Sequence, residues 1–151
     1  MNSGIKLKNL LFTTMDDKKV VLARIIVGLI FLSEGIQKFL FPGTVGTARF
    51  EKIGFDDPAF WSGFTATFEI VCGAFVLLGF LTRIASVPLL IIMLTAFVTT
   101  KWPLLIHKGI WVMAHEYRTD FAMTLLLVYL LIAGGGRCSL DLKFFQTVRI
   151  D

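Results

Sequence analysis

The sequence predicts an all-α membrane protein built as a bundle of four transmembrane helices. Of its 151 residues, 56% are hydrophobic and 17% are charged, whereas soluble domains carry roughly 25% charged residues. A soluble chain of this length could not bury so much apolar surface. The apolar residues form long blocks separated by charged islands. Blocks of about 20 apolar residues match the thickness of a bilayer core.

The boundaries of the predicted spans follow helix start and stop signals. Asp57 and Pro58 suit the N-cap and the first position of a helix. Pro42 and the Trp102-Pro103 pair predict helix ends, because proline interrupts a helix interior. Backbone groups in lipid must pair within their own segment, so we expect helices. The predicted spans are residues 19–41, 58–81, 83–101 and 119–133; the last is the shortest and could begin one turn earlier.

The rest of the chain is arranged around these spans. Residues 1–18 form a polar arm, residues 19–141 the membrane domain and residues 142–151 a tail. The long connections at 42–57 and 102–118 lie on one side, because successive spans alternate in direction, and could together form a lid. Nine of the 15 Lys and Arg residues fall on the other side, with the termini. This bias predicts that both termini are cytoplasmic and that both long connections lie outside.

Charge pattern and cysteine spacing argue against several function classes. The net charge is +4, but the basic residues are scattered over short loops without a basic helix, so we do not expect nucleic-acid binding. Cys72 and Cys138 form no Cys-x-x-Cys motif, which argues against thiol–disulfide exchange. The two histidines lie in a predicted connection instead of on facing spans, which argues against haem.

Ionisable residues inside the spans are the main functional candidates, because an unpaired charge in a bilayer is costly. Glu34 and Lys38 are four residues apart, in the order that favours direct pairing. Glu69 has no basic residue three or four positions away, so it needs a partner from another element. We expect Glu34, Lys38 and Glu69 to form a catalytic cluster in the outer half of the membrane, binding a ligand or moving protons. The alternative is a Glu34–Lys38 pair that only fixes helix packing.

Two arginines near the span ends are candidates for binding a substrate or a partner. For Arg24 and Arg83, as for Lys38, the alternative is that the side chain extends to the lipid headgroups. Gly28 and Gly35 share a helix face with Arg24 and Lys38. Small residues on such a face allow another helix to come close, either within the bundle or in a homodimer.

The second long connection is apolar and aromatic, which suits the membrane interface. His115 and Asp120 are five residues apart and do not match the helical spacing of metal ligands, so we predict no metal site. A hydrogen-bonded cap, a quinone-type headgroup site and a plain interfacial loop remain as alternatives. The candidate substrate- or partner-binding residues here are His107, His115, Glu116, Arg118 and Asp120.

Four short motifs within residues 20–141 form a combined pattern. They are Arg24-x-x-x-Gly28…Gly35-x-x-Lys38, Glu69-x-x-x-Gly73…Leu78-Gly79-x-x-Thr82-Arg83, His115-Glu116-x-x-Thr119-Asp120-Phe121, and the closing run Gly134-Gly135-Gly136-Arg137-Cys138-Ser139-Leu140-Asp141. Together they resemble the DoxX family of small four-span bacterial membrane proteins. The third motif looks like a signature of one bacterial branch.

The resemblance implies a plasma-membrane protein linked to an oxidoreductase system. Some relatives are subunits of thiosulfate:quinone oxidoreductase, and others are associated with oxidative-stress partners. No redox-cofactor motif is visible in the sequence, so electrons would come from a partner enzyme. The leading hypothesis is therefore a membrane subunit that binds a quinone. The alternatives are a non-catalytic anchor or assembly partner for a redox enzyme, and a small-solute transporter or sensor.

Overall fold

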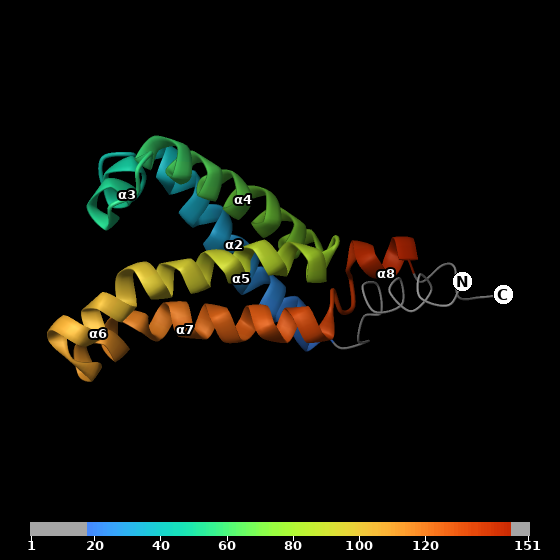
Figure 1. The fold of residues 1–151 in the computed structure, drawn as a ribbon. Coiled ribbons are helices and arrows are strands. Elements are labelled where there is room, and N and C mark those ends of the chain that lie inside the picture. Colours follow the sequence, from blue (N-terminus) through green and yellow to red (C-terminus); the bar gives the residue numbers. More distant parts are fainter. Residues whose placement is uncertain (1–17, 146–151) are drawn as a thin grey trace, which may run out of the picture.

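The computed structural model describes residues 18–145, and all of the regular elements in this range are helices (Figure 1). Most of the predicted N-terminal arm and the last six residues of the predicted tail lie outside this range. The long elements are α2 (Lys19–Leu40), α4 (Pro58–Leu78), α5 (Thr82–Ala96) and α7 (Ile110–Ala133). The short ones are α3 (Thr47–Ile53), η1 (Phe97–Lys101), α6 (Trp102–Lys108) and α8 (Leu140–Phe145).

Three helical segments are long and apolar enough to cross a membrane: Lys19–Leu40, Pro58–Leu78 and Thr82–Lys108. They match the first three predicted spans, except that the first ends one residue and the second three residues earlier than predicted, and the third runs on to Lys108. Helix α7 contains the fourth, but every 18-residue stretch of α7 includes Glu116 and Asp120 together with Arg118. Because of these three charged residues, α7 differs in composition from the three helical segments named above.

The structure corrects the predicted connection at residues 102–118, which is helical and not a loop. The third span does not end at Trp102-Pro103, because η1 is a π-helix and leads directly into α6. Pro103 lies at the start of α6, directly after the wider turn of η1. The chain breaks only at Gly109, with φ 84° and ψ 171°. Helix α7 then begins at Ile110, well before the predicted start at residue 119.

The first long connection contains an element that the sequence analysis did not predict. Helix α3 packs against the beginning of α4 and ends at Gly54, which adopts φ 94°. The ring of Phe55, just after α3, lies 5.8 Å from that of Trp61, near the start of α4. Helix α3 is thereby held on the α4 side of the bundle.

The long helices form two pairs that diverge toward one end of the molecule. Helix α2 packs along α4, and α5, extended by η1, packs along α7. The pairs meet near α8 and spread apart toward α3 and α6 (Figure 1). The two connections therefore lie at the same end of the bundle, as predicted.

Two glycines determine how closely α2 approaches α4. A Cβ atom on Gly35 would lie 2.7 Å from the carbonyl oxygen of Ala66, and one on Gly28 would lie 2.7 Å from Cβ of Leu77. Real side chains do not tolerate such distances, so the predicted close approach at both positions is confirmed. Where the four long helices meet, the apolar core includes Val27, Phe31, Val76, Leu89 and Leu127.

Candidate functional site

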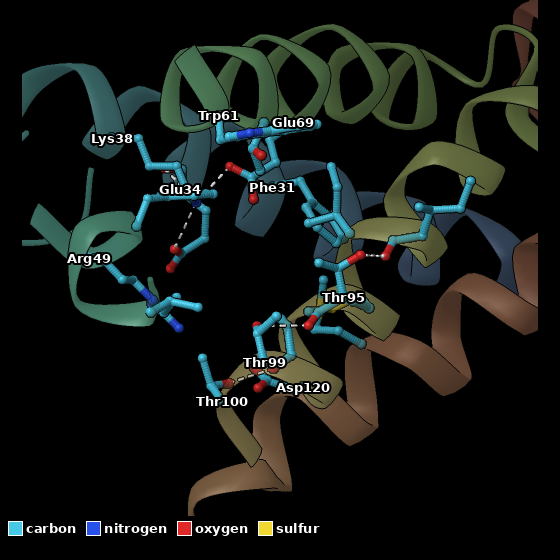
Figure 2. A pocket seen from close by; sticks show the side chains of 18 of the residues that line it. Phe31, Glu34, Lys38, Arg49, Trp61, Glu69, Thr95, Thr99, Thr100 and Asp120 are labelled. Carbon is cyan, nitrogen blue, oxygen red and sulfur yellow. Dashed lines mark hydrogen bonds and ion pairs between the residues drawn. The ribbon is translucent and has the colours of Figure 1, made fainter. Parts of the chain in front are cut away.

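A cavity of about 500 Å³ lies between the diverging helix pairs. Residues from α2, α3, α4, α5, η1 and α7 line it, so both pairs contribute walls. Figure 2 shows polar side chains around the open space. The apolar part of the lining includes Phe31, Phe50, Phe55, Trp61, Phe64, Ile92 and Met123. An apolar cavity with a few converging polar groups is the usual form of a small-molecule site.

On one wall, Lys38 joins two carboxylates. Its Nζ atom lies 2.7 Å from Oε2 of Glu69 and 3.7 Å from Oε2 of Glu34. The predicted pairing of Glu34 with Lys38 is confirmed, but the shorter contact goes to Glu69 on α4. The side chains of Lys38 and Glu69 are 8% and 5% exposed, whereas that of Glu34 is 47% exposed. Glu34 is therefore the carboxylate of this cluster that is open to a ligand.

The close approach of α2 and α4 makes this contact. Gly35 lies one helical turn before Lys38, and a Cβ atom there would lie 3.1 Å from Cβ of Glu69. Because no side chain fills that position, the helices come close enough for Lys38 to reach Glu69. The ion pair between Lys38 and Glu69 thus depends on the glycine at position 35.

The other wall carries a second ion pair, which the sequence analysis missed. Nζ of Lys101, at the end of η1, lies 3.4 Å from Oδ2 of Asp120 on α7 and donates to the carbonyl oxygen of Glu116 at 2.9 Å. The side chains of Lys101 and Asp120 are 13% and 27% exposed. Asp120 and Glu116 were among the predicted candidates, and both line the cavity. Lys101 was not among them, because it was placed at a span end before an expected loop.

Threonines beside this second pair add oxygen acceptors. The hydroxyls of Thr95, Thr99 and Thr100 each donate to the carbonyl oxygen four residues earlier, at 2.9, 2.8 and 2.5 Å respectively. Their hydrogens are thus used within the helix, and the oxygens remain available as acceptors. All three line the cavity, and Figure 2 shows Thr99 and Thr100 close to Asp120.

Arg49 adds a further positive charge. It belongs to α3 and lines the cavity, and Figure 2 places it on the same side as Glu34 and Lys38. The sequence analysis did not single out Arg49, because α3 was expected to be part of an open connection. The lining thus contains four carboxylates and three basic groups: Glu34, Glu69, Glu116, Asp120, Lys38, Arg49 and Lys101.

Three of the five binding residues predicted in the second long connection lie outside the cavity lining. His107, His115 and Arg118 are exposed, and Nη1 of Arg118 lies 3.4 Å from Nδ1 of His115. Within residues 18–145, no group of three His, Cys, Asp or Glu side chains is placed to hold a metal ion.

Arg24 and Arg83 lie near α8, away from the cavity. Arg24 is 4% exposed, and its guanidinium donates to the carbonyl oxygens of Val76, Leu77 and Gly135 at 3.1, 3.0 and 2.8 Å. It also approaches the carbonyls of the chain just after Gly135. Arg83 donates to the carbonyl oxygen of Ile132 at 2.6 Å. Arg24 thus ties α2 to the ends of α4 and α7 and does not extend toward headgroups.

The closing Ser-Leu-Asp segment completes this end of the bundle. Oδ1 of Asp141 accepts from the backbone N–H of Leu81 at 2.6 Å, and Oδ2 accepts from the backbone and hydroxyl of Thr82 at 3.0 and 2.9 Å. Asp141 therefore caps the start of α5 from a distant part of the chain, in place of a local N-cap side chain. Two of the motifs quoted above meet here, in a structural role.

Comparison with known proteins places the chain among membrane proteins, in keeping with its long apolar helices. Residues 20–102 match the family described as DoxX. The chain is 51% identical over 128 residues to the uncharacterized membrane protein Rv3486 of Mycobacterium tuberculosis, covering 81% of this chain and 78% of the relative. It is 30% identical over 127 residues to a Bacillus subtilis protein named "Putative oxidoreductase CatD", covering 83% and 87%. No solved structure matches the chain.

Proposed function

Because the chain belongs to the DoxX family of membrane proteins, we propose that it is a membrane subunit of a quinone-linked oxidoreductase system whose cavity holds the quinone headgroup. The observation that carries the proposal is the meeting of aromatic walls with the buried Lys38–Glu69 pair in one cavity of about 500 Å³. The relative named as an oxidoreductase adds support.

The chemistry of the cavity suits a quinone. A quinone has a flat ring, and the apolar faces of this ring can pack on aromatic side chains such as Phe31 and Trp61. Its oxygens can accept charge-assisted hydrogen bonds from Lys38 or Arg49, which are stronger than neutral ones. In the reduced form its hydroxyls can donate to Glu34, the more exposed carboxylate. The electrons are supplied or removed by a partner enzyme, and this chain positions the ring and handles its protons.

In the proposed topology, helix α7 is the fourth span. Two of the charged residues in its first half, Glu116 and Asp120, line the cavity. Both termini are cytoplasmic in the bacterial inner membrane, in keeping with the Lys and Arg count. The cavity then lies in the outer half of the bilayer, where a membrane-dissolved quinone can reach it.

Tryptophan fluorescence provides the test, because Trp61 lines the cavity. Purified protein in lipid nanodiscs is titrated with a short-chain alkyl-1,4-benzoquinone. We expect saturable quenching that is largely lost in Trp61→Phe and that shifts to higher quinone concentration in Lys38→Met. Lys108→Met is the matched control, because Lys108 is exposed and lies outside the lining. Quenching that never saturates, or that ignores both variants, would remove the proposal.

A further inference from the structure

Two ion pairs border the cavity from different helix pairs. Lys38 and Glu69 belong to α2 and α4, whereas Lys101 and Asp120 belong to η1 and α7. Figure 2 shows the first pair and the second wall on different sides of the open space. Aromatic and aliphatic side chains make up much of the remaining lining. The cavity therefore carries an ion pair on each of two sides, together with aromatic and aliphatic side chains.

Each ion pair can bind an oxygen atom of a quinone or of the hydroquinone formed by its reduction. An ammonium group has three hydrogens to donate. Nζ of Lys101 uses one on the carbonyl of Glu116 at 2.9 Å and faces Asp120 at 3.4 Å. Nζ of Lys38 makes one short contact, 2.7 Å to Glu69, and longer ones to Glu34 at 3.5 and 3.7 Å. Lys101 therefore keeps one N–H beyond its two printed contacts, and at Lys38 a ligand oxygen can replace one of the two longer contacts to Glu34.

Resting on the proposed function, we infer that Lys101 and Asp120 form a second anchor for the ligand. The cavity takes an aromatic ring with oxygens at opposite ends, a 1,4-quinone or 1,4-hydroquinone. One oxygen lies at Lys38 and Glu69, and the other at Lys101 and Asp120. A carbonyl oxygen accepts from the ammonium at its end, and a hydroxyl also donates to the carboxylate. Both redox forms therefore fit the same two anchors.

The π-helix supplies this second anchor. It contributes Thr99, Thr100 and Lys101, three consecutive residues that all line the cavity. The wider turn of a π-helix often occurs at functional sites. The threonine oxygens add acceptors beside Asp120, which favours a hydroxyl at this end. A ligand held at both anchors also joins the two helix pairs where they diverge.

The test compares rings that carry two oxygens with a ring that carries one. The probes are an alkyl-1,4-benzoquinone, its hydroquinone, and a 4-alkylphenol with the same chain, the last two measured by competition with the quinone. The full chain is compared with Lys38→Met, Lys101→Met and the control Lys108→Met. Each of the first two replacements removes a charge-assisted hydrogen bond, so each is expected to weaken the two-oxygen rings about tenfold. Only one of the two replacements is expected to weaken binding of the phenol, because the phenol has a single oxygen and can occupy only one anchor.

Asp120→Asn gives an independent reading if Lys101→Met fails to fold. It removes the acceptor charge and preserves the shape of the side chain, so it is expected to weaken the hydroquinone more than the quinone. The inference is overturned if Lys101→Met and Asp120→Asn both bind every probe as Lys108→Met does. In that case saturable quinone binding by the unmodified chain would still support the proposed function. Failure of the unmodified chain to bind any probe would overturn both.

Discussion

Nζ of Lys38 on α2 and Oε2 of Glu69 on α4 lie 2.7 Å apart in the interior of the bundle, with side chains only 8% and 5% exposed. Both groups also line the cavity. The contact therefore joins the tightest helix pair of the fold to the candidate binding site. Its contributions to stability and to binding can be separated by mutation.

Replacing Glu69 alone is expected to destabilise the protein. Glu69→Leu leaves the Lys38 ammonium buried without its closest partner, which costs about 3 kcal/mol, near the lower end for broken buried pairs because Glu34 remains 3.7 Å away. Lys38→Met/Glu69→Leu removes both charges, so it should recover most of that loss. Unfolding in detergent measures stability, and quinone titration measures binding. If the double variant regained both stability and full quinone affinity, the ion pair would have no binding role.

Gly35→Ala is expected to weaken both packing and binding. The added Cβ would lie 2.7 Å from the backbone oxygen of Ala66, which cannot rotate away. Overpacking of this kind costs about 1–3 kcal/mol, and the shift of α2 from α4 also separates Lys38 from Glu69. Gly63→Ala is the matched control, because nothing lies within 4 Å of the added atom and alanine favours a helix by up to about 1 kcal/mol. Equal thermal stability of the two variants would contradict this packing account.

Arg24→Lys is expected to lower stability without changing quinone affinity. Lysine cannot reproduce the planar fork with which Arg24 binds the carbonyls of Val76, Leu77 and Gly135. Loss of one such charged hydrogen bond costs about 1.5 kcal/mol or more. Arg118→Lys on the exposed face of α7 is the control and should stay within about 0.5 kcal/mol. A clear loss of affinity in folded Arg24→Lys would mean that this end of the bundle acts on the site.

Cysteine labelling tests the proposed topology. Cys138 is exposed and lies just before α8, whereas Cys72 is buried. A membrane-impermeant maleimide added to intact spheroplasts is expected to spare Cys138 and to label Lys108→Cys, which lies at the opposite end. After lysis Cys138 should react as well. Labelling of Cys138 in intact cells would place the termini outside.

The sequence predicted the helices and one half of the site because those features are local. Long apolar blocks marked the spans, and the four-residue spacing of Glu34 and Lys38 predicted their contact. The preference of Lys38 for Glu69 depends on how α2 is rotated against α4, which no local pattern specifies. Even so, the lack of a partner on its own span marked Glu69 as needing one from elsewhere.

The other half of the site was missed for a different reason. The sequence predicts a helix end at Trp102-Pro103, whereas the π-helix before Pro103 lets the helix continue. Lys101 was consequently placed at a span end, and its pairing with Asp120 depends on the alignment of two long antiparallel segments. Arg49 was missed because a seven-residue helix in a connection has no strong sequence signal.

Photoaffinity labelling tests the central claim most directly. An azido-substituted 1,4-quinone is crosslinked to the protein in native membranes, and the labelled residues are mapped by mass spectrometry. The account predicts labels on cavity residues such as Phe31, Trp61 and Met123, all suppressed by excess unlabelled quinone. Labels confined to outward-facing residues such as Leu22 and Ile132, with none suppressed, would contradict it.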